Sequence, residues 1–379
     1  MVNNIPYGRQ WIDEDDISAV AKVLQSDWLT QGPDIEEFEK EIAEYVGAKY
    51  AVAFSSGTSA LHGAMFAAGI GPGDEIITSP ITFVATSNSA IYLGARPRFV
   101  DIDLKTYCID TAKIEEAITP NTKVIAPVDL AGYPVNIETI MGIARRHNVV
   151  VVEDSAHALG AKRNGKMVGT GADMSLFSFH PVKHITTGEG GAITTDNEEF
   201  YKKMKIFVTH GITKDPALLQ RNDGPWYYEM QELGFNYRLT DFQCALGLSQ
   251  LKKIEGFLDR RNEIASMYNE AFKDIEGLVM PPKPEQYSSR HAYHLYPILV
   301  TKTDRKEAYI KLREMGIFAQ VHYIPVHLQP YYRNNYGFKK GDYPNAEYYY
   351  EHELSIPMYP KMKNEEVNYV IQSIKSLTK

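Results

Sequence analysis

The sequence predicts an α/β protein with a large, mostly parallel central sheet flanked by helices, followed by a smaller C-terminal α/β domain. Between about residues 50 and 195, short apolar runs alternate with helical patterns, which is typical of right-handed βαβ units. Several of these runs are apolar throughout, as parallel strands covered on both faces should be. A proline-rich break at 281–284 then precedes a second α/β pattern. The 379 residues suffice for two such domains.

The N-terminal part predicts an extended arm and two helices. Residues 1–12 lack a helical pattern and are expected to form the arm. Asp13 has the residue type of a helix N-cap, so a first helix should run to about residue 25. A second helix is expected over 35–45, with Gly47 as its stop signal.

The central sheet is expected to contain seven strands, each a short run rich in apolar or β-branched residues. They are predicted at 50–54, 75–78, 96–100, 123–128, 149–153, 174–178 and 191–194.

The C-terminal part predicts a long amphipathic helix over 241–272 and a smaller domain after it. We place the domain boundary inside that helix, which gives a large domain at 13–250 and a small domain at 251–379. In the small domain, strands are expected at 294–301 and 318–322 around a helix at 305–315. A closing helix is expected at about 364–376.

Composition excludes several function classes. Forty Lys and Arg against 48 Asp and Glu give a formal charge of −8, which provides no basic field for nucleic acid. No run of eighteen apolar residues occurs, so no membrane partner is expected. Cys108 and Cys244 are too few for a disulfide framework or a cysteine-rich zinc site and fit a reducing, cytoplasmic setting. The N-terminus has no apolar signal region.

Lys183 is the residue that points to a chemistry. It lies in a small polar loop, about thirty residues after an apolar run that ends in Glu153 and Asp154. An enzyme that uses pyridoxal 5'-phosphate (PLP) needs a lysine that forms a Schiff base with the cofactor and an acid that pairs with the pyridinium nitrogen. Taken alone, Lys183 is more readily explained as a surface charge and Asp154 as a turn cap, and the surrounding segments change that weight.

Three further segments fit the same cofactor. Gly57, Thr58 and Ser59 follow a strand and open a helix, where backbone amides and hydroxyls can bind a phosphate, although a plain helix cap would look alike. Phe83 could stack on the pyridine ring or pack in the core. His157, three residues after Asp154, could donate to the cofactor's phenolic oxygen, support Asp154, or be structural.

Two other motifs are rejected. His180 and His184 have the spacing of a zinc helix, but Pro181 occupies the place of the catalytic glutamate and glycines follow, so no metal site is expected. The glycine cluster at 69–73 precedes a strand rather than a helix, which excludes a dinucleotide-binding turn.

Taken together, these segments resemble the DegT/StrS family of sugar-nucleotide aminotransferases, which have the aspartate-aminotransferase fold (fold type I). The resemblance covers nearly the whole chain and rests on six segments in the family's order: 28–33, 56–61, 153–157, 178–183, 188–191 and 234–241. It implies PLP as the cofactor, bound by the large domain, with pyridoxamine 5'-phosphate as the intermediate form. It also implies a homodimer with shared active sites.

The resemblance also implies a set of site residues. Lys183 and Asp154 would be catalytic, and the cofactor would be held by Lys183, Asp154, His157, Gly57, Thr58, Ser59, Phe83, Ser178 and Asn236, the last from the partner subunit. The substrate would be held by Tyr7, Trp28, Leu29, Thr30, Gly57, Ser178, Asn236, Gln320, His322 and Tyr323. For Leu29 and Gln320, ordinary packing is an equally good interpretation.

Within the family, segments at 155–160, 294–299 and 319–326 resemble the transaminase branch of pseudaminic acid synthesis. That resemblance implies ping-pong transfer of the amino group of L-glutamate to C4 of a UDP-4-keto-6-deoxy-N-acetylhexosamine (UDP-2-acetamido-2,6-dideoxy-β-L-arabino-hex-4-ulose). Many members of the family have Gln where this chain has His157, and the histidine fits the pseudaminic branch.

Three alternatives stay open. One is an aminotransferase for another nucleotide-linked 4-keto or 3-keto deoxysugar, which the cofactor residues cannot distinguish. Another is a dehydratase relative, in which a histidine replaces the cofactor lysine. The third is a non-catalytic regulatory homodimer with the same fold. The presence of Lys183 argues against the last two.

Overall fold

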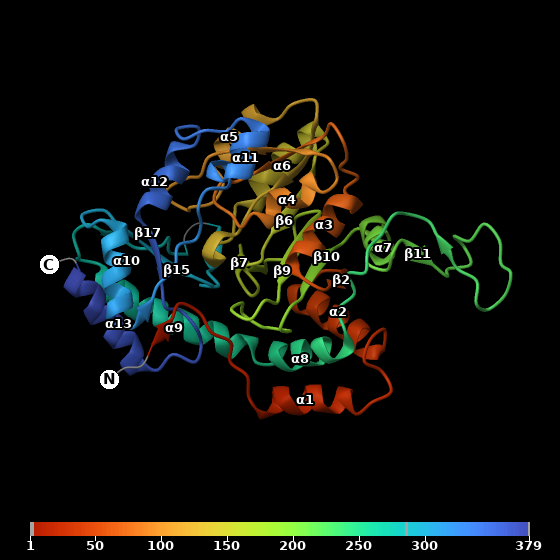
Figure 1. The fold of residues 1–379 in the computed structure, drawn as a ribbon, viewed down its shortest axis with the longest axis horizontal. Coiled ribbons are helices and arrows are strands. Elements are labelled where there is room, and N and C mark those ends of the chain that lie inside the picture. The colour runs from red at the N-terminus through yellow and green to blue at the C-terminus, as the bar shows by residue number, and fades with distance from the viewer. Residues whose placement is uncertain (1–3, 285–286, 378–379) are drawn as a thin grey trace.

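The computed structural model describes residues 4–284 and 287–377 (Figure 1). Residues 1–3 of the predicted arm, and residues 285, 286, 378 and 379 of the predicted small domain, lie outside the described residues.

A seven-stranded sheet forms the centre of the described structure (Figure 1), in the order β2-β10-β9-β6-β5-β3-β4. β10 pairs antiparallel with β2 and β9, and the remaining neighbours pair in parallel. The predicted α/β class with a mostly parallel sheet is therefore confirmed. The strands are β2 (Tyr50–Phe54), β3 (Glu75–Thr78), β4 (Arg96–Phe99), β5 (Thr122–Ala126), β6 (Val150–Asp154), β9 (Met174–Ser178) and β10 (Gly191–Thr195).

Helices flank this sheet, and the first two begin and end as predicted. Asp13 accepts from the backbone N–H of Asp16 and closes a capping box at the start of α1 (Glu14–Leu24). Gly47 adopts a left-handed conformation, φ 82°, and ends α2 (Pro33–Val46). The other flanking helices are α3 (Gly57–Ala67), α4 (Ala85–Ile91), α5 (Thr111–Ala117), α6 (Ile137–His147), α7 (Glu198–Phe207) and α8 (Asp241–Leu251).

The predicted single helix over 241–272 is wrong, because the structure has two helices there. α8 ends at Leu251, and α9 (Ile254–Phe272) follows. The backbone N–H of Lys253 donates to the Gln250 carbonyl, which tightens the turn. The Lys253 ammonium is held by Asp13 and Asp16, 2.7 Å from each, so the junction is tied to α1. The domain boundary near residue 250 stays a prediction.

A smaller three-stranded antiparallel sheet, in the order β13-β15-β17, lies in the C-terminal part. Helices α9, α10 and α13 lie beside it (Figure 1). The elements are β13 (Leu278–Val279), β15 (Tyr296–Val300), α10 (Arg305–Glu314), α11 (Pro330–Tyr336), α12 (Pro344–His352), β17 (Glu353–Ile356) and α13 (Asn364–Leu377).

The predicted strand at 318–322 is also wrong in its extent. β16 covers only Ile317–Phe318 and pairs in parallel with β1 (Ile5–Pro6) from the N-terminal arm. The chain then leaves the ladder, because the His322 backbone N–H donates to the Glu353 side chain instead of to a neighbouring strand. Short paired strands elsewhere are β7 (Lys162–Arg163), β8 (Lys166–Met167), β11 (Ile212–Thr213), β12 (Glu229–Met230) and β14 (Ser288–Arg290).

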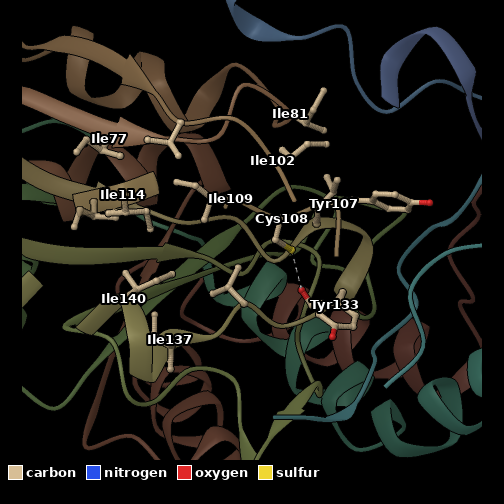
Figure 2. Close-up of a cluster of buried hydrophobic side chains, with 14 of the residues drawn as sticks. Ile77, Ile81, Ile102, Tyr107, Cys108, Ile109, Ile114, Tyr133, Ile137 and Ile140 are labelled. Carbon is tan, nitrogen blue, oxygen red and sulfur yellow. Dashed lines mark hydrogen bonds between the residues drawn. The ribbon is translucent and has the colours of Figure 1, made fainter. Parts of the chain in front are cut away.

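One of the apolar cores lies under β3 and β5 and is rich in isoleucine. Figure 2 shows Ile77, Ile109, Ile114 and Ile140 gathered there, with the Cys108 thiol donating to the Tyr133 carbonyl at 3.7 Å. Cys108 and Cys244 are both buried free thiols. In the described ranges, no helix combines the length and the apolar character needed to cross a bilayer.

A buried ion cluster supports the central strand β6. The Arg163 guanidinium is bonded to Glu153 through both terminal nitrogens and lies 3.9 Å from Asp129. Glu153 and Asp129 are fully buried. Two hydroxyls add further hydrogen bonds, since Ser175 donates to Glu153 at 2.9 Å and Ser155 to Asp129 at 2.7 Å. Breaking such a pair leaves a buried charge uncompensated.

We therefore expect Arg163→Met to lower the free energy of unfolding by about 3–5 kcal/mol. The control is Arg146→Met, which breaks an exposed pair with Glu115 and should cost at most about 1 kcal/mol. Urea unfolding of both variants measures the difference. Equal costs would mean that Arg163 does not neutralise the buried carboxylates.

Candidate active site

A cavity of about 400 Å³ lies at the carboxyl ends of the parallel strands β6 and β9. Ligands of open α/β sheets bind at this edge. The cavity brings together ten of the predicted site residues from opposite ends of the chain: Tyr7, Gly57, Thr58, Phe83, Asp154, His157, Ser178, Lys183, His322 and Tyr323.

Lys183 lies in the loop after β9, and its amine is 3.4 Å from Nε2 of His294. Burial lowers the pKa of Lys183 to about 7, with help from the Arg261 cation and against the opposing effect of Asp154. A lysine amine near neutrality is a nucleophile at physiological pH. This environment therefore suits covalent attachment of a cofactor.

Asp154 is buried at the end of β6 and its carboxylate is fixed by two donors. The Thr86 hydroxyl donates to Oδ2 at 2.6 Å, and the Ala156 backbone N–H donates to Oδ1 at 3.2 Å. Burial raises the pKa of Asp154, while these two donors and Lys183 oppose the rise. Each oxygen keeps a free acceptor site, so Asp154 can receive an N–H from a ligand.

The geometry around His157 defines its tautomer. Nδ1 accepts from the Ala131 backbone N–H at 3.2 Å, so the ring hydrogen is on Nε2, which donates to the Tyr323 hydroxyl at 3.1 Å. Burial, followed by Lys183, lowers the pKa of His157 well below its usual value, so the ring is neutral. His157 therefore supports Tyr323 here, and its predicted contact with a phenolic oxygen stays a prediction.

His294 lines the same cavity, and the sequence analysis did not select it as a site residue. Its ring centroid lies 4.4 Å from that of His157, and its Nδ1 is buried without a hydrogen-bond partner in the described structure. Arg261 of α9 donates to the Tyr293 and His294 carbonyls at 3.0 and 3.2 Å and so fixes this segment. His294 lies 111 residues after Lys183 in the chain, and no local pattern connects them.

The predicted phosphate cup is the N-terminus of α3. Ser56 caps the helix, and the Ser59 hydroxyl is already used, since it donates to the Ser56 carbonyl at 2.8 Å. Ser59 does not line the cavity, and its predicted phosphate contact stays a prediction. A Cβ on Gly57 would approach Ser178 within 3.2 Å, and one on Gly191 would lie 2.7 Å from the Ser56 carbonyl oxygen. Glycine is therefore required at Gly191, where an added Cβ would meet backbone, and favoured at Gly57, where it would press on the Ser178 side chain.

Besides Ser59, five predicted substrate or cofactor residues lie outside the residues that line the cavity: Trp28, Leu29, Thr30, Asn236 and Gln320. All five are exposed, Trp28 to 55% and Leu29 to 47%. A single chain does not bring these residues to its own cavity, so their predicted contacts stay predictions.

The residues present fit PLP. Lys183 offers an amine of lowered pKa, Asp154 offers fixed acceptor sites, and the α3 N-terminus beside Thr58 and Ser178 offers donors for a phosphate. The buried, unpartnered Nδ1 of His294 marks a polar wall that a ligand would complete.

Comparisons with known proteins point to one family. The DegT/DnrJ/EryC1/StrS aminotransferase family matches residues 10–375. Spore coat polysaccharide biosynthesis protein SpsC of Bacillus subtilis is 42% identical, over 99% of this chain and 97% of its own. The UDP-4-amino-4,6-dideoxy-N-acetyl-β-L-altrosamine transaminase of Campylobacter jejuni is 39% identical, over 98% and 97%.

Two solved structures of aminotransferases are similar to this chain over nearly its whole length. Helicobacter pylori PseC, described as an aminotransferase of pseudoaminic acid biosynthesis, has a TM-score of 0.92 and 35% identity, with 99% of each chain covered. The putative sugar aminotransferase Spr1654 of Streptococcus pneumoniae, solved in a PMP form, has a TM-score of 0.93 and 33% identity, with 99% of each chain covered.

We expect Gly191→Ala to push β10 away from the cup and cost about 1–3 kcal/mol, divided between folding and cofactor binding. The measurements are the dissociation constant of PLP and the urea midpoint. Gly71→Ala is the matched control, since a Cβ there meets nothing within 4 Å. Unchanged values in Gly191→Ala would contradict the close approach.

We also expect attachment of PLP to the cofactor-free protein to accelerate with pH and level off above about 7, since only the neutral Lys183 amine reacts. At pH 6 the rate should be about a tenth of its plateau. Asp154→Asn removes the charge that raises the pKa of Lys183, so in this variant the midpoint of the pH dependence of attachment should fall to a lower pH. Stopped-flow absorbance measures both, and a midpoint near that of free lysine would contradict the assignment.

Proposed function

Because this chain belongs to the DegT/DnrJ/EryC1/StrS aminotransferase family, we propose that it transfers the amino group of L-glutamate to C4 of a UDP-linked 4-keto-6-deoxy-N-acetylhexosamine. The observation that carries the proposal is the single cavity that holds Lys183 and Asp154 at one end and Tyr7, His322 and Tyr323 on its wall. The first pair suits amino transfer, and the wall offers polar groups to a sugar.

Family membership establishes the reaction class, the fold type and the cofactor on which this proposal is built. The protein is a sugar aminotransferase of fold type I, and its cofactor is PLP, in agreement with the PLP- and PMP-form structures of Spr1654. The predictions of the family, of an enzyme and of the cofactor are confirmed.

Each residue has a defined task in the proposed reaction. When bound, PLP supplies a carrier for the amino group and a ring that withdraws electrons from the reacting carbon. Asp154 would receive the pyridinium N–H, and Thr58 and Ser178 would hold the phosphate. The Lys183 amine would move a proton at the substrate carbon, because it lies at that end of the cavity and can be neutral near pH 7.

The pseudaminic acid branch is supported by two relatives together. The Campylobacter jejuni transaminase is 39% identical, and the Helicobacter pylori aminotransferase aligns over 99% of both chains. We therefore favour UDP-2-acetamido-2,6-dideoxy-β-L-arabino-hex-4-ulose as the acceptor. SpsC, at 42% identity, favours a second candidate, in which another nucleotide-linked keto-deoxysugar is the acceptor.

We further propose that the working unit is a homodimer in the cytoplasm. The segment around β11 and β12 projects from the body (Figure 1) and exposes Trp226 to 72% and Leu233 to 73%. Such an apolar projection suits a protein interface. Asn236, at its base, and Trp28 are exposed outside their own cavity, as residues given to a partner's site would be.

The absorption spectrum of the purified protein tests the first half of the reaction. We expect a visible cofactor band that L-glutamate converts to that of the pyridoxamine form, and that the UDP-keto-sugar restores. Lys183→Ala should lower turnover by about 10²–10⁴-fold or more. The control is Lys166→Ala, an exposed lysine in β8.

Two outcomes would count against the proposal. If the band ignores L-glutamate, the amino donor is wrong. If a dTDP-linked keto-sugar or a D-configured UDP sugar restores the band faster than the L-arabino sugar does, the second candidate replaces the first.

A further inference from the structure

We propose that Glu353, acting through Ser355, is a positioning residue that sets whether the His322 ring shows a hydrogen-bond acceptor or a donor to the cavity. The inference deepens the proposed function, because His322 is one of the groups expected to meet the sugar. It rests on a buried hydrogen-bond chain in which each hydroxyl and ring nitrogen can give only one proton.

The chain runs from β17 to the cavity wall. Ser355 Oγ lies 2.6 Å from Glu353 Oε1 and 2.9 Å from His322 Nδ1. The His322 backbone N–H donates to the other carboxyl oxygen, Oε2, at 2.8 Å. Backbone bonds between Gln320 and Ser355, at 2.8 and 3.0 Å, hold the two segments together. Glu353 and Ser355 are fully buried, so water cannot replace either partner.

The remaining ring nitrogen of His322, Nε2, is the one left for a ligand. His322 lines the cavity, with its ring centroid 5.1 Å from that of Tyr7 and 5.0 Å from that of Tyr323. Within the described structure, Nδ1 is bonded to Ser355 and Nε2 has no protein hydrogen-bond partner. The hydrogen bond between Nδ1 and Ser355 therefore decides whether Nε2 carries the ring hydrogen.

Proton counting gives two states. With Glu353 ionised, the Ser355 hydroxyl donates to Oε1 and must accept from His322 Nδ1–H, so Nε2 is a bare acceptor. With Oε1 protonated, that proton is donated to Ser355, whose hydroxyl donates to Nδ1, so Nε2–H is a donor. The change takes up one proton at Nε2 and passes one along the chain to Glu353, while the imidazole stays neutral throughout.

The surroundings place this change near neutral pH. Burial raises the pKa of Glu353 to about 8, against the lowering effects of Ser355, the His322 amide and the Arg305 cation. Burial, and then Lys183, lower the pKa of His322 to about 3. The other titratable groups that face these two are Tyr7, Tyr107, Tyr323, Tyr349 and the neutral His157. Burial raises the pKa of each of these tyrosines, so they stay neutral.

Histidine-labelled ¹⁵N NMR of the PLP-loaded enzyme tests the inference without any substrate. The protonated and bare ring nitrogens differ in chemical shift, and loss of a signal in His322→Gln assigns the ring among the 11 histidines. In the unmodified enzyme, we expect Nε2 to carry the hydrogen below a midpoint of about pH 8 and Nδ1 to carry it above.

Three variants separate the relay from a general effect of charge. Glu353→Gln keeps a carbonyl for the His322 N–H and turns an NH₂ toward Ser355, so it should lock Nε2–H at every pH. Ser355→Ala should remove the pH dependence by cutting the chain. Glu351→Gln, an exposed glutamate paired with Lys340, should behave as the unmodified enzyme.

The same tautomer at all pH values in the unmodified enzyme, or no difference between it and Glu353→Gln, would overturn the inference. Kinetics then test whether Nε2 of His322 contacts the sugar. KM for the keto-sugar should change with pH through the same midpoint in the unmodified enzyme and stay independent of pH in Glu353→Gln. A flat KM in both would overturn the link to the substrate. If the sugar is not a substrate at all, the proposed function fails, while the NMR result still decides whether Glu353 sets the tautomer.

Discussion

The site depends on how two adjacent carboxylates at the end of β6 are kept in the interior. Successive side chains of a strand point to opposite faces, so Glu153 meets Arg163 on one side while Asp154 enters the cavity on the other. In a low-dielectric interior, neither charge would be tolerated alone. Arg163 balances Glu153, while burial and the neighbouring Glu153 raise the pKa of Asp129, which favours its neutral form. This leaves Asp154 free to be balanced by Lys183 and by the donors Thr86 and Ala156.

Buried histidines line the cavity beyond that pair. His157, His294 and His322 are all buried, and burial lowers the pKa of each. Neutral rings act through the position of one hydrogen, so fixed partners such as the Ala131 amide and Ser355 decide what each ring offers. A wall of this kind can discriminate hydroxyl and amide groups of a sugar without attracting ions nonspecifically.

Much of the fold and the cofactor end of the site could be predicted from local patterns. Lys183 and Asp154 carry strong signals because a strand end and a glycine-rich loop mark their places, and both line the cavity. The break at Lys253 could not be predicted, because the contacts that hold it are ion pairs with Asp13 and Asp16, some 240 residues away in the chain. His294, Arg261 and Glu353 were missed for the same reason, since their roles arise from contacts between distant segments. Trp28 and Asn236 are exposed in this chain, so their predicted contacts rest on the proposed partner subunit.

The close approach of backbones at the predicted phosphate cup restricts substitutions there more than on the rest of the cavity wall. Gly191 lies so close to the backbone at Ser56 and Gly57 that no larger side chain fits there without displacing backbone, and a Cβ on Gly57 would press on the Ser178 side chain. Tyr7, His322 and Tyr323 stand on other elements, the N-terminal arm and the segment beside β17. Changes that give the wall a new shape therefore need not disturb the cup. Descendants of one gene can acquire new sugar preferences while the anchor for the cofactor stays fixed.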